Sequence, residues 1–393
     1  MKKQFWCFLL LPFMALAFIP ARKSDGTGTW KALKTKNDPG GRSECSMAAV
    51  NGKLYLIGGD GGDALPVERL DPKTLTWTKL APQPTVMHHF QLVALDKKIY
   101  ALEAFSTGGF PSQEPMANVE IYDTETDTWV KGGEMPAARR RAGAGAVAYK
   151  GKLYLVAGIQ HGHQSGTTNM FDVYDPTTST WSPLPDAPHI RDHCFAAVVG
   201  DKLYVVGGRN TSFRDPQNKL NFFSQTMLDV DCYDFTTGTW SVLPAKLPLG
   251  TGGGNLVNLN NKLYYLGGER ATATENNAPR KNVFVLDPST GGGWQEIDSL
   301  KQARNGVAAA VVEGKIYIAG GAGGGPGGPG GPPPGVPGGP GAPGGFPPPG
   351  QGGNNQPPPG GPMPQDTSHH QPRMGPGGLG GGGSIAVEVF TVH

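Results

Sequence analysis

The stretch KLYLIGG at residues 53–59 decides the fold, because close copies of it recur along the chain. The copies are KLYLVAG (152–158), KLYVVGG (202–208), KLYYLGG (262–268) and KIYIAGG (315–321). Each is a short apolar and aromatic run that small residues close, which is typical of a buried strand. An apolar run and a tight turn such as Asn51-Gly52 come before it, as in a β-hairpin. Recurrence of one strand pattern predicts a repeat architecture.

A second motif follows each copy after a variable loop and ends in tryptophan. It reads VERLDPKTLTW (67–77), VEIYDTETDTW (119–129), FDVYDPTTSTW (171–181), VDCYDFTTGTW (230–240) and VFVLDPSTGGGW (283–294). Asp followed by Pro, as in Asp71-Pro72, has the turn chemistry that reverses one strand into the next. Each repeat therefore holds four short strands, with no helical period. Because such a sheet cannot bury both faces alone, we expect the copies to pack around an axis.

The order of apolar run, glycine pair, Tyr-Asp and tryptophan resembles the kelch repeat, a family of β-propellers. The resemblance covers residues 28–321 and 384–393. It implies an all-β ring in which each blade has four antiparallel strands, a to d, from the axis outward. The glycine pair then ends strand b, where neighbouring blades crowd together, and the tryptophan packs on strand d. The second copy departs from the pattern, because Glu103-Ala104 stands where the glycine pair belongs.

Five sets of strands are complete, and the pieces of a sixth lie at opposite ends of the chain. The complete sets end at Trp77, Trp129, Trp181, Trp240 and Trp294. The sixth has strands at 306–312, 315–320 and 385–392 and stops without a tryptophan, whereas Trp30 belongs to a strand with no set before it. We therefore predict a six-bladed propeller that Thr29–Leu33 closes, as the outer strand of the last blade, covering its open edge.

Two segments fall outside this pattern. Residues 1–21 combine Lys2 and Lys3 with an apolar run and small residues, as in a secretory signal peptide. We expect its cleavage, no transmembrane segment in the mature chain, and a secreted, periplasmic or extracellular location. Residues 322–383 are dominated by Gly and Pro, which predicts a disordered insert in the b–c loop of blade six. The propeller then comprises residues 22–321 and 384–393.

Composition excludes several classes of protein. The formal net charge of +2, from 34 Lys and Arg against 32 Asp and Glu, is too balanced for a nucleic-acid binder. Four cysteines exclude a disulfide-stapled scaffold, and Cys45, Cys194 and Cys232 of the mature chain are expected to be buried free thiols. The sequence has no phosphate-binding loop, dinucleotide fingerprint or hydrolase nucleophile motif. We expect a monomer that needs no cofactor.

Aligning the blades on the lysine of KLY gives three sets of equivalent residues. The first set, at the start of strand a, is Arg42, Met87, Arg141, Arg191, Thr251 and Arg304. The second set, two residues later, is Glu44, His89, Gly143, His193, Gly253 and Gly306. The third set, just after the glycine pair, is Asp60, Phe105, Ile159, Arg209, Glu269 and Ala322. All fall on the face with the d–a connections and the long b–c loops, where binding sites concentrate.

These sets predict a polar pocket at the mouth of the central channel. Guanidinium groups bind carboxylates through paired hydrogen bonds, so the ligand-binding candidates are Arg42, Arg141, Arg191, Arg209, Glu269 and Arg304. The proton-transfer candidates are His89, His193, Glu103 and Glu44. Two alternatives stay open: the arginines can be repeat features that hydrogen-bond between blades, and the histidines can be structural. Glu103 should need a neighbouring arginine, unless it reflects sequence drift.

The stretch QHGHQ at residues 160–164 carries two further histidines, His161 and His163. No fixed spacing of ligands accompanies them, and a solvated loop is the competing interpretation. We therefore assign no metal site from the sequence.

Two functions of different classes fit these features. Kelch propellers most often bind partners, so an exported module that binds a small sugar or a protein through the b–c loop face and the channel mouth is our first hypothesis. The resemblance extends to exported bacterial N-acetylneuraminate epimerases, which interconvert sialic acid anomers. This alternative implies arginine for the carboxylate and His or Glu for proton transfer.

Overall fold

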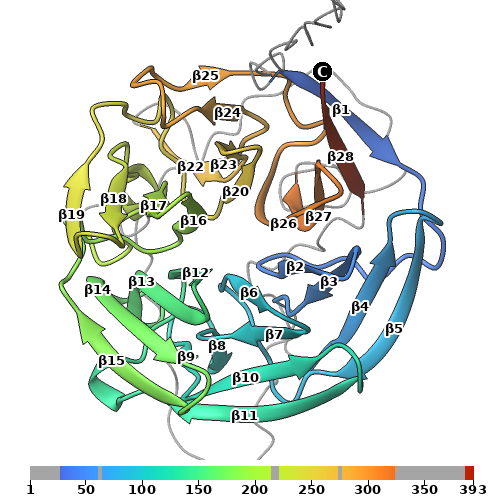
Figure 1. Cartoon of the computed structure of the whole chain (residues 1–393), viewed down its shortest axis with the longest axis horizontal. Coiled ribbons are helices and arrows are strands. Elements are labelled where there is room, and N and C mark those ends of the chain that lie inside the picture. The colour runs from blue at the N-terminus through green and yellow to red at the C-terminus, as the bar shows by residue number, and fades with distance from the viewer. Residues whose placement is uncertain (1–26, 61–63, 214–220, 273–276, 324–385) are drawn as a thin grey trace, which may run out of the picture.

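The computed structural model describes residues 27–60, 64–213, 221–272, 277–323 and 386–393. Six four-stranded antiparallel sheets stand around a central axis (Figure 1). The predicted six-bladed, all-β propeller is confirmed. Tight turns such as Asn51-Gly52, both with positive φ, join strands a and b, as the sequence predicts. The signal peptide predicted at residues 1–21 and nearly all of the predicted insert lie outside the described residues.

Blades one to five take their strands in chain order, from the axis outward. Blade one comprises β2 (Ser46–Val50), β3 (Lys53–Ile57), β4 (Pro66–Asp71) and β5 (Thr76–Pro82). Blade two comprises β6 (Leu92–Leu95), β7 (Lys98–Ala101), β10 (Asn118–Asp123) and β11 (Thr128–Glu134). Blade three comprises β12 (Gly145–Tyr149), β13 (Lys152–His161), β14 (Ser165–Asp175) and β15 (Thr180–Leu184). Blade four comprises β16 (Phe195–Val199), β17 (Lys202–Val206), β18 (Asp231–Asp234) and β19 (Thr239–Val242). Blade five comprises β20 (Asn255–Leu259), β21 (Lys262–Leu266), β24 (Val283–Leu286) and β25 (Gln295–Glu296).

The two ends of the described chain meet in blade six. This blade comprises β26 (Arg304–Val312), β27 (Lys315–Gly323), β28 (Val387–Val392) and, outermost, β1 (Gly28–Leu33). Strand β1 pairs antiparallel with β28, in a register that places Trp30 opposite Phe390 (Figure 1). The predicted closure of the ring by the N-terminal strand is therefore confirmed. Lys36 then bridges to Thr76 on β5, so the same segment also touches blade one.

The hydrophobic core of the ring is divided into clusters that repeat from one blade interface to the next. The six largest hydrophobic clusters each join two neighbouring blades. The glycine pair is needed where the blades crowd: a Cβ at Gly207 would lie 2.0 Å from the hydroxyl of Tyr265 in the next blade, and Gly207 also has a φ of +68°. Cys45, Cys194 and Cys232 are buried free thiols, as predicted.

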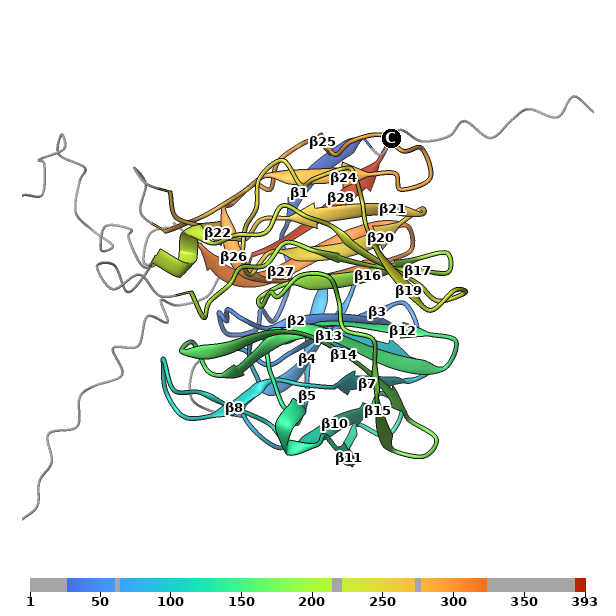
Figure 2. The same cartoon turned by 90° about the vertical axis from the view of Figure 1, so that its left-hand side faces the viewer.

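Several segments expected as loops between strands b and c contain further strands. In blade two they form the hairpin β8 (Phe105–Thr107) with β9 (Glu114–Pro115), and in blade five the hairpin β22 (Glu269–Arg270) with β23 (Ala278–Pro279). In blade three, β13 and β14 continue into a long hairpin with its turn at residues 162–164. Figure 2 shows β8, β22 and the short 3₁₀ helix η2 (Asn221–Ser224) projecting on one side of the ring. We call this side the loop face.

One other short 3₁₀ helix, η1 (Ala137–Arg139), precedes strand a of blade three. Within the described part of the chain, neither helix approaches the length and apolar character that a membrane span needs.

Candidate functional site

The arginines that open strand a lie inside the blades. Arg141, Arg191 and Arg304 are fully buried, and Arg42 is 3% exposed. Each of the four donates to the backbone carbonyls around the ends of its own strands b and c. Each also pairs with an acidic residue on its own strand c: Glu68, Asp172, Asp231 and Glu388, in that order.

We call each arginine, with the carbonyl groups and the acid that it binds, the arginine bracket. The bracket ties strand a to strands b and c of the same blade. Of the two interpretations of these arginines, the geometry matches the structural one, with the correction that the bonds stay within a blade rather than crossing between blades. A guanidinium that already holds a buried carboxylate and carbonyl groups has few donors left for a ligand. The sequence carried the signal, because each of these blades has an acid directly after the first apolar residue of its strand-c motif, which reads VERLD (67–71), FDVYD (171–175), VDCYD (230–234) or VEVF (387–390).

The second set of aligned residues forms a ring of backbone around the axis. We call Glu44, His89, Gly143, His193, Gly253 and Gly306 the axial ring. All six have a φ between 52° and 63°. Backbone hydrogen bonds link successive members, for example from His89 N to Glu44 O and from Gly253 N to His193 O, both at 3.0 Å. Beneath the ring lies a cavity of about 20 Å³, which is room for a water molecule.

Three members of the axial ring hold a left-handed conformation without being glycine. For an L-residue that conformation costs roughly 1–2 kcal/mol, and glycine occupies the same position in the other three blades. Nothing in the scaffold calls for a side chain at Glu44, His89 or His193, because the ring also closes through the glycines. Backbone strain of this kind concentrates at functional sites.

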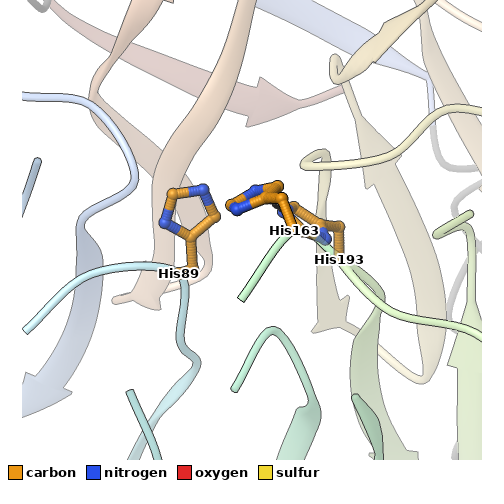
Figure 3. A group of neighbouring side chains, drawn as sticks. All are labelled: His89, His163 and His193. Atoms are coloured by element: carbon orange, nitrogen blue, oxygen red, sulfur yellow. Dashed lines mark hydrogen bonds between the residues drawn. The ribbon is translucent and has the colours of Figure 1, made fainter. Parts of the chain in front are cut away.

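A third histidine joins the two of the axial ring. His163 sits in the turn of the β13–β14 hairpin, and its backbone N–H donates to Pro111 O of blade two at 2.8 Å. The ring centroids of His89, His163 and His193 are 5.0 to 5.1 Å apart, which makes a nearly equilateral triangle. Figure 3 shows the three imidazoles turned toward one another. We call these residues the histidine triangle. His163 and His193 are buried, at 5% and 4% exposed, and the side chain of His89 is 8% exposed.

A polar partner holds the outer nitrogen of each ring. His193 Nδ1 lies 2.5 Å from Asp192 Oδ1, and His163 Nδ1 lies 3.1 Å from Gln113 Oε1. His89 Nδ1 lies 2.6 Å from His88 Nδ1.

Burial lowers the pKa of all three triangle histidines. The charge of Arg209 adds to this effect at each of them and neighbouring imidazoles add to it at His89 and His163, whereas Asp192 opposes it at His163 and His193. The triangle is therefore neutral at pH 7. Asp192 is different: burial opposes its ionisation, but hydrogen bonds from His193 and Thr167 and the charge of Arg209 lower its pKa to about 2.

A second polar group lies beside the triangle. Arg209 pairs with Glu269 at 2.6 Å and stands over the rings of Phe222 and Phe223. Glu44 lies 3.6 Å from His89 Nε2. Burial, with the nearby charge of Glu269, raises the pKa of Glu44 to about 8. Glu44, Arg209 and Glu269 are thus brought together with His89 and His193, as expected for the channel mouth.

Glu103 has no arginine partner. No hydrogen bond of normal geometry reaches either carboxylate oxygen, although the backbone N–H groups of Gly143 and Ala144 lie close enough to favour its charge. Arg141, the nearest candidate, is engaged by Asp172. Burial between blades two and three raises the pKa of Glu103 well above its usual range. The partner that the sequence analysis required is absent from the described residues.

Sequence reasoning missed three contributors to the site. The sequence offers His163 only as one of two histidines in the QHGHQ stretch, with no metal site assigned, and it singles out neither Asp192 nor Gln113. Asp192 directly precedes His193, and this Asp-His pair was the one local signal available. The position of His163 depends on the bend of a hairpin, which no spacing in the sequence encodes.

Comparisons with known proteins agree with the fold. A family model described as the KLHDC2/KLHL20/DRC7 Kelch-repeats domain matches residues 103–321, and one for the Kelch motif matches residues 41–84. Kelch-like protein terF of Aspergillus terreus is 26% identical over 329 residues, which are 80% of this chain and 69% of that protein. Kelch-like protein 23 of Homo sapiens is 28% identical over 68% of this chain, which spans only 43% of that relative. The solved structure of YjhT superposes with a TM-score of 0.62 at 18% identity and covers 74% of this chain and 93% of its own, a likeness of fold.

Proposed function

Because the chain belongs to the kelch-repeat family of β-propellers, we propose that it is a binding module that takes a protein partner on its loop face. The observation that carries the proposal is the placement of exposed apolar side chains. Phe110 is 46% exposed in the β8–β9 hairpin, and Phe213 is 38% exposed in the b–c loop of blade four. Ile190 and Leu228, 46% and 40% exposed, lie in a d–a connection and at the end of that b–c loop. Exposed aromatic groups are frequent anchors of protein interfaces.

Contacts between loops give these residues a shared support. Gln164 Nε2 donates to Ser112 Oγ at 2.8 Å, which fastens the blade-three hairpin to blade two. Thr167 N donates to Ser212 Oγ at 2.7 Å, which fastens the same hairpin to blade four. The loops that carry Phe110 and Phe213 are therefore docked on either side of one hairpin. A preorganised surface loses less entropy on binding than separate flexible loops do.

The test compares two double variants of the full chain. Phe110→Ala with Phe213→Ala removes the loop-face aromatics, whereas Val130→Ala with Val242→Ala removes two residues of similar exposure from outer strands. Partners captured by the parent protein are identified by mass spectrometry, and their affinities are then measured with purified protein. An aromatic anchor typically contributes about 2 kcal/mol or more to binding, which is a factor of about 30 in affinity. The Phe110→Ala, Phe213→Ala variant should therefore bind the partner at least about 30-fold more weakly than the parent. Equal affinity of both variants would refute the loop face as the binding surface.

The epimerase alternative has one favourable observation. A protonated Glu44 beside the neutral imidazole of His89 provides an acid and a base, which is what sugar ring opening needs. The arginines that would hold a sialic acid carboxylate weigh against it, because four of the five are engaged within blades and Arg209 is paired with Glu269. An NMR anomerisation assay with N-acetylneuraminate distinguishes the two functions. Rate acceleration that Glu44→Gln abolishes would favour the enzyme over the binding module.

Export is part of the same proposal. A signal peptide at residues 1–21 would deliver the propeller to a secreted, periplasmic or extracellular location, where its partner would be found. N-terminal sequencing of the mature protein tests this, because export predicts a start close to Ala21.

A further inference from the structure

We propose that the histidine triangle of His89, His163 and His193 binds a first-row divalent transition-metal ion, with Zn²⁺ as the reference ion. The site lies on the loop face at the mouth of the axis. The proposal is independent of the partner that the loop face takes, because its three ligands are none of the exposed apolar side chains proposed to anchor that partner.

The geometry of the triangle is close to that of a metal site. The three ligand nitrogens lie within 4.8 Å of one another, and the Nε2 atoms of His163 and His193 are 3.2 Å apart. A tetrahedral ion with Zn–N bonds of about 2.0–2.1 Å holds its nitrogen ligands about 3.3 Å apart and the imidazole centroids about 5.2 Å apart. The observed centroid distances of 5.0 to 5.1 Å therefore match a bound ion, with a small movement of His89 to complete it.

Hydrogen bonding fixes the tautomers that a metal requires. The carboxylate of Asp192, which also accepts hydrogen bonds from Thr167 and Thr211, and the amide oxygen of Gln113 are acceptors, so His193 and His163 each carry their proton on Nδ1. Their Nε2 atoms then face each other with lone pairs at 3.2 Å. A cation between them converts that repulsion into two bonds. An outer nitrogen held by a carboxylate or carbonyl oxygen is the usual arrangement around histidine ligands of metals.

The supporting groups are themselves held in place. Asp192 accepts hydrogen bonds from Thr167 Oγ1 at 2.6 Å and from Thr211 N at 3.0 Å in addition to His193. This network fixes the carboxylate, and through it the plane of the His193 ring. His163 is fixed in a second way, because its backbone N–H bonds to blade two.

The chemistry of the ligands selects the class of ion. Neutral imidazoles suit Zn, Cu, Ni and Fe, whereas Mg and Ca prefer oxygen ligands. Glu269 pairs with Arg209 and so offsets its positive charge beside the site. Phe105, fully buried, lies against His89 and His163 and excludes water from that side. Three protein ligands leave a fourth position open, as in catalytic zinc sites, and Glu44 lies next to it.

The test uses the full chain without a histidine tag, after removal of metal with a chelator. We expect it to bind one equivalent of Zn²⁺ by calorimetry and to develop the visible absorption of tetrahedral Co²⁺. His193→Asn and His89→Asn remove a ligand while keeping a residue that tolerates the left-handed backbone. Either should weaken Zn²⁺ binding by more than about 100-fold, and Asp192→Asn by about 10–100-fold.

Matched controls separate this site from other histidines. His161→Asn changes an exposed histidine of the same hairpin and should leave binding unchanged. A variant without His369 and His370, the adjacent pair in the Gly/Pro-rich segment, should keep its equivalent of metal as well.

The parent protein alone can overturn the proposal, so no variant needs to fold for the test to decide. A metal-free parent that binds no Zn²⁺, Co²⁺, Ni²⁺ or Cu²⁺ at micromolar concentration refutes it. Binding that survives both His89→Asn and His193→Asn in folded protein, judged by circular dichroism, refutes it as well. Neither result bears on the loop-face partner, which the Phe110 and Phe213 variants test.

Discussion

Replacing Trp30 by Ala tests whether the N-terminal strand is an integral part of the ring. Trp30 is 2% exposed, and its ring packs against Phe390 of β28 at a centroid distance of 5.2 Å. Truncation of a buried Trp to Ala costs about 3–5 kcal/mol through lost burial and the cavity left behind. For a ring of about 300 residues that unfolds cooperatively, this loss lowers the melting temperature by about 5–8 °C.

Trp77 provides a matched control. It is the equivalent tryptophan of blade one, 1% exposed, in a blade whose four strands follow one another along the chain. The indole N–H has no hydrogen-bond partner at either position, so both substitutions remove mainly apolar packing. If β1 is part of the same cooperative unit, Trp30→Ala and Trp77→Ala should destabilise the protein by similar amounts in urea unfolding followed by circular dichroism.

The two variants diverge if β1 detaches on its own. In that case the loss of unfolding free energy in Trp30→Ala cannot exceed the free energy with which β1 docks on the ring. Once that docking energy is lost, β1 detaches, and the remaining propeller unfolds with its own unchanged stability. A loss below about 1 kcal/mol for Trp30→Ala, beside 3–5 kcal/mol for Trp77→Ala, would refute the closed ring as a cooperative unit. Deletion of residues 24–36 should likewise destabilise the whole propeller.

Two further predictions concern buried charges. Arg191→Met leaves the buried Asp231 with His189 as its remaining ionisable partner and should cost up to about 3–5 kcal/mol in urea unfolding, whereas adding Asp231→Val should recover much of the loss; a double variant as unstable as the single one would argue against the bracket. The pKa of Glu44 is raised from 4.5 to about 8, so the proton stabilises the folded state, and stability should fall as pH rises from 4.5 through 8. In metal-stripped protein, Glu44→Gln should remove this pH dependence of the unfolding free energy. The pKa shift corresponds to up to about 4 kcal/mol, after a reduction for the 15% exposure of the Glu44 side chain. A stability difference between the parent and Glu44→Gln that does not change with pH would contradict the prediction.

The ring could be predicted from the sequence because its determinants are local and repeated. Glycine pairs, Asp-led turns and tryptophans mark the strand ends in most blades, and an incomplete final set with a leftover Trp30 strand specifies the closure. The hairpins of the loop face could not be predicted in this way. Their segments, such as residues 104–117 and 159–169, lack alternation, and they form strands because the core of the blade already holds the neighbouring β7 and β13 in register.

The site could be predicted only where it occupies repeat positions. Alignment of the blades located Glu44, His89 and His193 without any structure. The same alignment drew attention to the arginines, which recur because four of the six blades use the arginine and its acidic partner to tie strand a to strands b and c. The residues that recur between blades, such as the arginines, therefore belong to the scaffold, whereas the candidate site residues stand at aligned positions where the blades differ.

That contrast has an energetic basis. A position that serves only the ring is free to take the residue that the backbone favours, which at the axial ring is glycine, as at Gly143, Gly253 and Gly306. His89 and His193 depart from it at a cost of roughly 1–2 kcal/mol each, in a fold whose whole stability is on the order of 5–15 kcal/mol. At an exposed position a substitution of glycine by histidine could be neutral, but the side chains of His89 and His193 are largely buried, and the Nδ1 atom of each has a polar partner. The strain is then best explained by what the inner nitrogens do, and a shared cation is the partner that three converging imidazoles suit best.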